Sequence, residues 1–167
     1  MSKSSRRRKA IVPFTVMLVA GFASVPTASA ATNSIVINEV VTNSDPVGDW
    51  VELANTTDEP IDISGWTAID NGKKSKPITF PRGTVIPANG YYAFYTETNT
   101  PDGSAGFGLG GQDEMTISDK NGAVVDYQKW SSHGMRNGEH TSRGLVPDMH
   151  GTWQITDGAT REHANAG

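Results

Sequence analysis

The chain contains no cysteine and has few basic residues beyond its first thirty positions. Without cysteine it cannot form disulfides, thiolate zinc sites or iron–sulfur clusters, or use a cysteine nucleophile. Residues 1–30 hold five basic side chains and no acidic one, so the other 137 residues keep nine basic and eighteen acidic side chains, a net charge of −9. Binding to nucleic acid relies on neutralising phosphates, so we expect nucleic acid not to be a partner.

Helical patterns are also missing. No stretch of ten or more residues repeats apolar side chains at helical spacing, and no heptad run indicates a coiled coil. A length of 137 residues is typical of a single domain and too short for a TIM barrel. We therefore expect residues 31–167 to form one domain without helical layers.

The first thirty residues have the three parts of a secretory signal peptide. Ser2–Lys9 is basic, Ala10–Val25 is mostly apolar, and Ala28-Ser29-Ala30 is a small-x-small site, which predicts cleavage between Ala30 and Ala31. The apolar run of 16 residues is shorter than the roughly 20 that a spanning helix needs. We expect a secreted, extracellular protein with no membrane span after cleavage; loose attachment to the cell surface, or retention of the segment as an anchor, is the alternative.

Short β-branched or alternating runs, separated by turn residues, fill the first hundred residues of the mature chain. Asn71-Gly72 and Asn121-Gly122 are hairpin signals, since Asn-Gly supplies the positive φ that tight turns need. Residues 99–111 are glycine-rich and predict a loop, and most of 131–167 is irregular. This pattern predicts an all-β sandwich or barrel, with strands expected at Ser34–Val41, Asp49–Asn55, Ile61–Asp70, Pro77–Phe80, Thr84–Ile86, Gly90–Thr96, Glu114–Ser118, Ala123–Trp130 and Thr152–Ile155.

Short motifs follow one another along the chain in a characteristic order. They are Ile37-Asn38-Glu39-Val40, Asp49-Trp50-Val51-Glu52-Leu53-Ala54-Asn55, Ile61-Asp62-Ile63-Ser64-Gly65-Trp66, Asp70, Ile86-Pro87-Ala88-Asn89-Gly90-Tyr91, Phe107-Gly108-Leu109, Asp113-Glu114, Asp119, Gly122, Val125-Asp126, Trp130, Arg143, Trp153 and Ala164-Asn165. In this order, over about residues 35–165, the chain resembles the lamin-tail domain family, in the form found in exported bacterial proteins. The resemblance implies an immunoglobulin-like β-sandwich of about 7–9 strands that binds rather than catalyses.

The recurrent polar and aromatic residues of these motifs are interpreted mainly as structural. Glu39 lies in the alternation Ile35-Ile37-Glu39, which places it on the face of its apolar neighbours. With Glu52 it is expected to make structural hydrogen bonds, although two carboxylates also suit a cation site or acid–base catalysis. The residues interpreted in this way are Asn38, Glu39, Asp49, Trp50, Glu52, Asn55, Gly65, Trp66, Asp70, Trp130 and Trp153.

Two of the four tryptophans are also candidates for an exposed contact. Trp50 and Trp66 have alternating apolar neighbours and are expected in the core. Trp130 ends a predicted strand and Trp153 lies in the irregular tail, where an aromatic surface for a sugar or a peptide is an alternative to packing.

No catalytic, cofactor or metal site is predicted. The four histidines are separated by 7, 10 and 13 residues and include no HExxH motif, so the spacing does not indicate zinc. No GxSxG element supports a serine nucleophile. The dispersed Asp residues suit turns, and none follows the spaced calcium-loop pattern.

The sequence therefore predicts a secreted, non-catalytic binding or surface-interaction module. Its expected partner is a protein or a cell-wall glycan, with the oligomeric state left open. One alternative is an accessory component of a secreted metal-dependent hydrolase or nuclease that uses Glu39 and Glu52. Another is an envelope structural protein that associates with itself through sheet edges.

Overall fold

The computed structural model describes residues 33–43, 45–72 and 74–167. These residues form thirteen β-strands and no α-helix, and nothing helical in this part of the chain is long and apolar enough to cross a membrane. The predicted signal peptide, with its cleavage site between Ala30 and Ala31, lies outside the described residues. The all-β prediction is thus confirmed.

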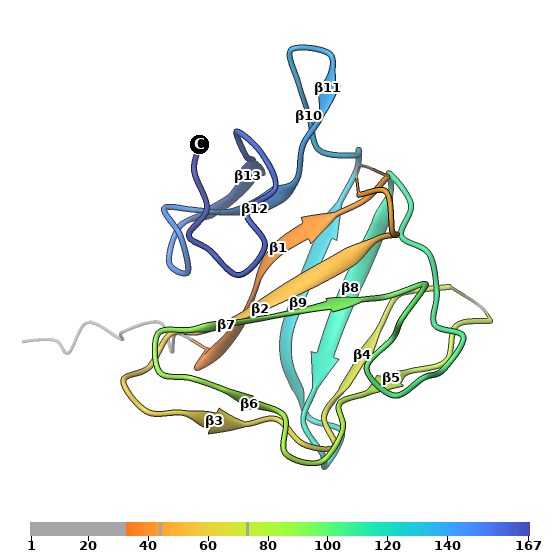
Figure 1. Ribbon diagram of the computed structural model, residues 1–167, viewed down its shortest axis with the longest axis vertical. Helices are drawn as coiled ribbons and strands as arrows, with labels where there is room; N and C mark the ends of the chain where they lie inside the picture. The colour runs from red at the N-terminus through yellow and green to blue at the C-terminus, as the bar shows by residue number, and fades with distance from the viewer. Residues whose placement is uncertain (1–32, 44, 73) are drawn as a thin grey trace, which may run out of the picture. The chain divides into compact units, whose positions relative to one another are not determined.

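A five-stranded antiparallel sheet forms the first layer (Figure 1). Its strand order is β13-β12-β1-β2-β7, so the chain leaves this sheet twice, once between β2 and β7 and again between β7 and β12. The strands are β1 (Ile35–Val41), β2 (Trp50–Asn55), β7 (Tyr91–Tyr95), β12 (Arg143–Val146) and β13 (Thr152–Ile155).

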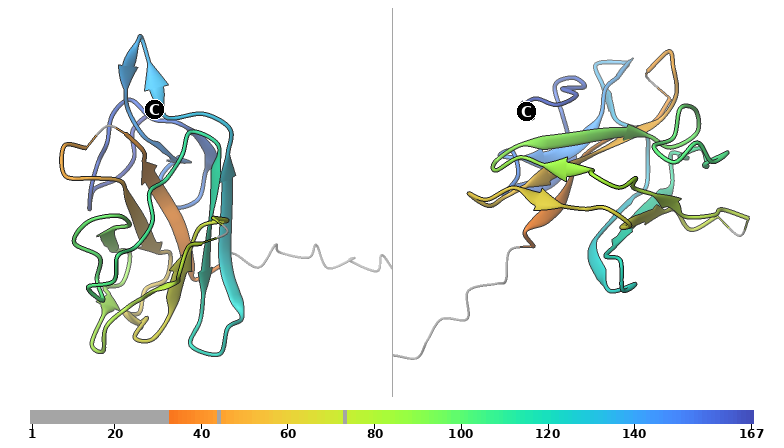
Figure 2. Two further views of the ribbon diagram at one scale, coloured as in Figure 1. Left: turned by 90° about the vertical axis from the view of Figure 1, so that its right-hand side faces the viewer. Right: turned by 60° about the horizontal axis from the view of Figure 1, so that its bottom comes forward.

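A four-stranded antiparallel sheet forms the second layer, in the order β5-β4-β8-β9. The two layers pack face to face as an immunoglobulin-like sandwich, seen from the side in Figure 2. This sheet consists of β4 (Thr67–Ile69), β5 (Ile78–Thr79), β8 (Asp113–Ser118) and β9 (Val124–Trp130), and two small ladders pair β3 (Ile61–Asp62) with β6 (Val85–Ile86) and β10 (Met135–Arg136) with β11 (Glu139–His140).

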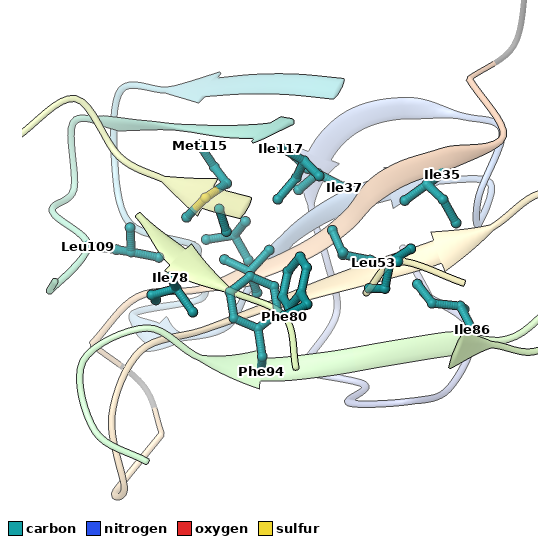
Figure 3. Packing of buried hydrophobic residues seen from close by; sticks show 14 of the residues in the cluster. Ile35, Ile37, Leu53, Ile78, Phe80, Ile86, Phe94, Leu109, Met115 and Ile117 are labelled. Carbon is teal, nitrogen blue, oxygen red and sulfur yellow. The ribbon is translucent and has the colours of Figure 1, made fainter. Parts of the chain in front are cut away.

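The apolar core lies between the two sheets (Figure 3). Side chains alternate across β2, so that Val51 and Leu53 enter the core while Trp50 faces the other way. Phe80 anchors the aromatic part of the core, with its ring meeting those of Phe94 and Tyr92 edge-on at centroid distances of 5.0 and 5.7 Å. Such T-shaped contacts add to the energy of apolar burial.

A β-bulge at Asn38 changes which side of β1 faces the core. Ile37 pairs with Leu53 and Glu39 pairs with Glu52, so Asn38 is the extra residue. Ile37 and Val40 therefore both enter the core, and Glu39 faces away from it. The expectation that Glu39 shares the face of Ile35 and Ile37 is wrong, because regular alternation does not continue through a bulge.

The sequence located most strands but not all of their limits. The hairpin at Asn121-Gly122 is confirmed: β8 pairs with β9, and Gly122 has φ 83°. The run Ile61–Asp70 is interrupted by a turn between β3 and β4, and β4 reaches β5 through residues 70–77 rather than through a tight Asn71-Gly72 turn. Strands β10, β11 and β12 were not predicted.

Truncation of a core side chain tests this packing. We expect Leu53→Ala to lower the free energy of unfolding by about 2–5 kcal/mol, because the site is fully buried and cannot collapse around the cavity. Val124 is 64% exposed, so Val124→Ala should change the free energy of unfolding by no more than about 0.5 kcal/mol. Urea denaturation of both variants measures the difference; equal values would contradict the assigned core.

Candidate functional site

The outer face of the five-stranded sheet carries the two glutamates that the sequence singles out. Glu39 and Glu52 stand directly opposite each other on β1 and β2, and both are fully buried. A carboxylate removed from water must be compensated by hydrogen bonds or by protonation. The groups that surround the pair therefore decide what it can do.

Glu39 is held by donors from the C-terminal part of the chain. The Thr160 amide N–H donates to both carboxylate oxygens, at 3.1 Å each, and the Thr160 hydroxyl donates to Oε2 at 3.2 Å. The Ser142 hydroxyl makes a short hydrogen bond to Oε1. Glu39 is thus anchored to segments that lie more than a hundred residues away in sequence.

Glu52 is held in the same way from the other side. The Glu162 amide N–H makes a short hydrogen bond to Oε2, and Asn38 Nδ2 donates to Oε1 at 2.9 Å. Asn38 also donates to Asp148 Oδ1 at 3.0 Å and accepts the Met149 amide N–H at 3.0 Å. The bulged residue therefore joins Glu52 to the loop that connects β12 and β13.

Asp148 and Asn165 complete this network. Asp148 accepts the Tyr91 hydroxyl at 2.7 Å and the Asn165 amide at 2.9 Å, while Asn165 Nδ2 donates to the Asn38 carbonyl at 2.8 Å. Gly144 permits this approach, because a Cβ there would lie 2.6 Å from Asn165 Nδ2. The C-terminal segment, residues 157–167, is thereby fixed over the sheet.

An aromatic contact fastens the same segment beside the carboxylates. Arg161 places its guanidinium 4.4 Å from the ring centroid of Tyr95 and 5.9 Å from that of Trp50, and donates to the Tyr95 hydroxyl at 2.7 Å. Trp50 is 1% exposed and packs with Val41 and Ala93 on this outer face. Trp50 is buried as predicted, but beneath the C-terminal segment rather than between the sheets.

Burial controls the ionisation of the glutamates. Removal from water raises the pKa of Glu52 from its ordinary value of 4.5 to about 7. The hydrogen bonds from Asn38 and Glu162 lower this pKa only in part, and the nearby carboxylates of Glu39 and Asp148 add a smaller rise. The pKa of Glu39 is likewise raised by burial. Among the residues described by the structure, no lysine or arginine is a hydrogen-bond partner of either carboxylate.

This arrangement does not present an acid–base pair to a substrate. General acid–base catalysis requires a group within reach of the substrate's proton, whereas each carboxylate here is covered and accepts a backbone N–H of the chain itself. In the described part of the chain, no group of three or more His, Asp or Glu is placed to hold a metal ion. The geometry therefore gives no support to the metal-dependent hydrolase alternative.

Four other motif residues fix loops. Asp49 accepts the amides of Asn43 at 2.8 Å and Leu109 at 2.7 Å. Asn55 donates to the carbonyls of Glu59, Ile86 and Pro87 and accepts from Thr57. Gly65 adopts φ 75° in the turn before β4, and Asp70 accepts the Gly72 amide at 3.0 Å. Each holds backbone in place at the end of a strand.

The remaining tryptophans do not form an exposed aromatic surface. Trp130 is 4% exposed, belongs to the core, and donates its indole N–H to the Gly110 carbonyl at 2.8 Å. The candidate exposed contact at Trp130 is therefore wrong: its strand ends inside the sandwich. Trp66 and Trp153 are half-buried and pack against the same core.

An open cleft lies where the edges of the two sheets meet. β12 pairs with β1 only at Glu39 and Val40, and the earlier part of β1 is bound instead by Asp126 of β9, which accepts the Ile37 amide at 2.7 Å. The cleft beside this contact has a volume of about 210 Å³ and is lined by Val36, Leu145, Met149, Asp126, Gln128 and His150 among others. Sequence reasoning missed it, because its walls come from β1, β9 and the β12–β13 loop.

The described residues thus define an immunoglobulin-like β-sandwich with a sealed pair of carboxylates on one sheet and an open cleft at its edge. The chain belongs to the lamin tail domain family: the family's model matches residues 28–132. No curated protein matches the chain. The matched residues end soon after β9, whereas the donors to Glu39 and the C-terminal segment lie beyond them.

The raised pKa of Glu52 predicts an unusual dependence of stability on pH. Because the folded state keeps this proton up to about pH 7 and the unfolded chain releases it near 4.5, the stabilisation is complete below 4.5 and is lost as pH rises through 7. We expect this group to make the free energy of unfolding about 2 kcal/mol lower at pH 8 than at pH 5. Urea denaturation at both pH values measures it.

Two variants separate this effect from other titrations. Glu52→Gln is neutral throughout and should reduce the difference between pH 5 and pH 8, whatever its effect at a single pH. Glu59 is exposed, so Glu59→Gln should leave the difference unchanged. An undiminished difference in Glu52→Gln would show that Glu52 does not titrate in this range.

The contact between Thr160 and Glu39 predicts a second stability effect. Thr160→Val keeps the shape of the side chain but removes the hydroxyl, which lies within hydrogen-bond distance of Glu39 Oε2 and of Asn165 Oδ1, so we expect the free energy of unfolding to fall by about 1–2 kcal/mol. Thr79→Val is the matched control, since Thr79 is exposed on β5. Equal urea midpoints for the two variants would contradict a stabilising role for this contact.

Proposed function

We propose that this lamin-tail chain is an exported, non-catalytic binding module, and that the cleft between β1, β9 and the β12–β13 loop is its binding surface. The observation that carries the proposal is the contrast between two sites: the glutamate pair is sealed by the chain itself, whereas the cleft is open. Loops and edges on a rigid sandwich are common places for recognition. A protein at the cell surface or in the wall is the expected partner.

Rigidity of the cleft wall supports this proposal. Asp148 and Met149, in the β12–β13 loop, are bonded to Asn38, and Met149 lines the cleft with 8% of its surface exposed. A pre-formed wall loses little conformational entropy on binding. The sealed network and the open cleft are therefore parts of one arrangement, in which the first positions the second.

The export part of this proposal has its own test. Expression of the full chain should release a protein that begins at Ala31, because Ala28-Ser29-Ala30 fits a signal-peptidase site. Ala28→Lys should block cleavage and leave the precursor cell-bound, whereas Asn33→Lys, beyond the site, should not. Mass spectrometry of the secreted and cell-bound fractions reads the N-terminus; full-length protein in the medium would contradict cleavage.

Capture of a partner tests the binding role. Immobilised Ala31–Gly167 should retain a partner from cell-wall or secreted fractions, and Val36→Phe, which fills the cleft, should reduce that retention at least tenfold. Val85→Phe is the control, because Val85 is 46% exposed on β6 and does not line the cleft. Equal retention by both variants would place binding elsewhere. No partner, together with multimers that grow with concentration, would favour the self-associating alternative.

A further inference from the structure

Asp126 is the acidic group of the cleft, and among the residues that the structure describes no lysine or arginine lines the cleft beside it. Its carboxylate accepts neutral donors: Oδ2 accepts the Ile37 amide at 2.7 Å, Oδ1 accepts Asn33 Nδ2 at 3.3 Å, and the Tyr127 backbone amide donates as well. The strand pairing of Asp126 with Ile117 turns its side chain inward from β9. Within the described part of the chain, the carboxylate therefore reaches the cleft without a lysine or arginine to balance it.

Burial raises the free energy of this unbalanced negative charge on Asp126. Removal from water raises the pKa of Asp126, and the amide donors offset that rise only in part. A positive charge placed in the cleft would favour the ionised carboxylate and would itself be balanced. The cleft thus has an electrostatic reason to accept a cation.

The other walls of the cleft suit an aliphatic chain. Val36, Leu145 and Met149 supply apolar surface from three different elements. A volume of about 210 Å³ is below the roughly 300–1,000 Å³ of a pocket for a small molecule. It matches a single long side chain, and Lys places a four-carbon apolar stem below a compact charge.

We propose that the cleft binds the side chain of an exposed lysine on a partner protein, with the stem against Val36, Leu145 and Met149 and the ammonium at Asp126. This inference rests on the proposed binding function and adds the chemistry of the partner. Lysine fits better than arginine, because both oxygens of Asp126 already accept a hydrogen bond and do not offer a free bidentate face. The net charge of −9 over residues 31–167 draws basic partners over longer distances.

A peptide titration tests the proposal on the mature chain. Acetyl-Gly-Gly-Lys-Gly-Gly-amide should shift the methyl NMR signals of Leu145 and Met149 in a saturable way. The same peptide with norleucine, which keeps the stem and lacks the charge, should bind at least tenfold more weakly, as should the glutamate peptide. Equal binding of the norleucine and lysine peptides, or no shift with lysine, would overturn the proposal.

Two variants test whether the ammonium group of the peptide binds at Asp126. Asp126→Asn keeps an oxygen for the Ile37 amide and should weaken the lysine peptide at least tenfold. Because this change touches the joint between the sheets, Gln128→Lys serves as a second variant: it places an ammonium in the cleft from the half-exposed side of β9 and should compete with the peptide. Lys74→Gln, at an exposed loop remote in sequence, is the control and should not alter binding. Unchanged binding in Gln128→Lys would overturn the proposal.

The outcomes separate this inference from the function on which it rests. If wild-type chain captures a partner, Val36→Phe loses it, and the lysine peptide has no effect, the binding function stands and the lysine proposal fails. If no partner is captured and Val36→Phe has no consequence, the binding function fails. Capture of a partner whose exposed lysines can be acetylated without loss of binding would also overturn the lysine proposal.

Discussion

Two carboxylates lie side by side in the middle of a sheet, away from water, and the rest of the outer face is arranged to satisfy them. Glu39 and Glu52 pair across β1 and β2, and within the described part of the chain no cation is bonded to either. Two buried like charges are unfavourable, and hydrogen-bond donors together with a raised pKa are what remain to relieve them. The backbone amides that do this come from the C-terminal segment, so the closing residues of the chain are required for the central strands to be stable.

The β-bulge at Asn38 places Glu39, with its need for hydrogen-bond donors, on the outer face of the sheet. Regular alternation would have directed Glu39 into the apolar core, where no donor is available; the extra residue turns it outward together with Asn38. Asn38 then bonds to Glu52 and to both Asp148 and Met149. One irregular residue therefore links the stability of the sheet to the position of a loop that forms a wall of the cleft. Strand irregularity here organises the candidate site as well as the fold.

The sequence allowed the sandwich to be predicted because β-branched runs and Asn-Gly turns are local signals. The outward direction of Glu39 was not predictable, since the bulge shows only as an interruption of pairing with β2, and pairing depends on the partner strand. The exposed alternative for Trp130 fails for a related reason: Trp130 ends its strand, but the loop that carries Gly110 covers it. The cleft was missed entirely, because Val36, Asp126 and Met149 are far apart in sequence and meet only when the sheet edges are joined.

The carboxylates with a structural role differ from the one proposed to contact a partner in what covers them: the chain's own hydrogen-bond donors lie over the former. Glu39, Glu52 and Asp148 each accept donors from the C-terminal segment, which covers them. Asp126 accepts only donors at the joint between the sheets and lines an open cleft. All four are acidic side chains in an acidic domain, so composition and spacing cannot tell them apart. What differs is whether the folded chain places its own atoms over the group, and beside Asp126 the described residues leave an open cleft.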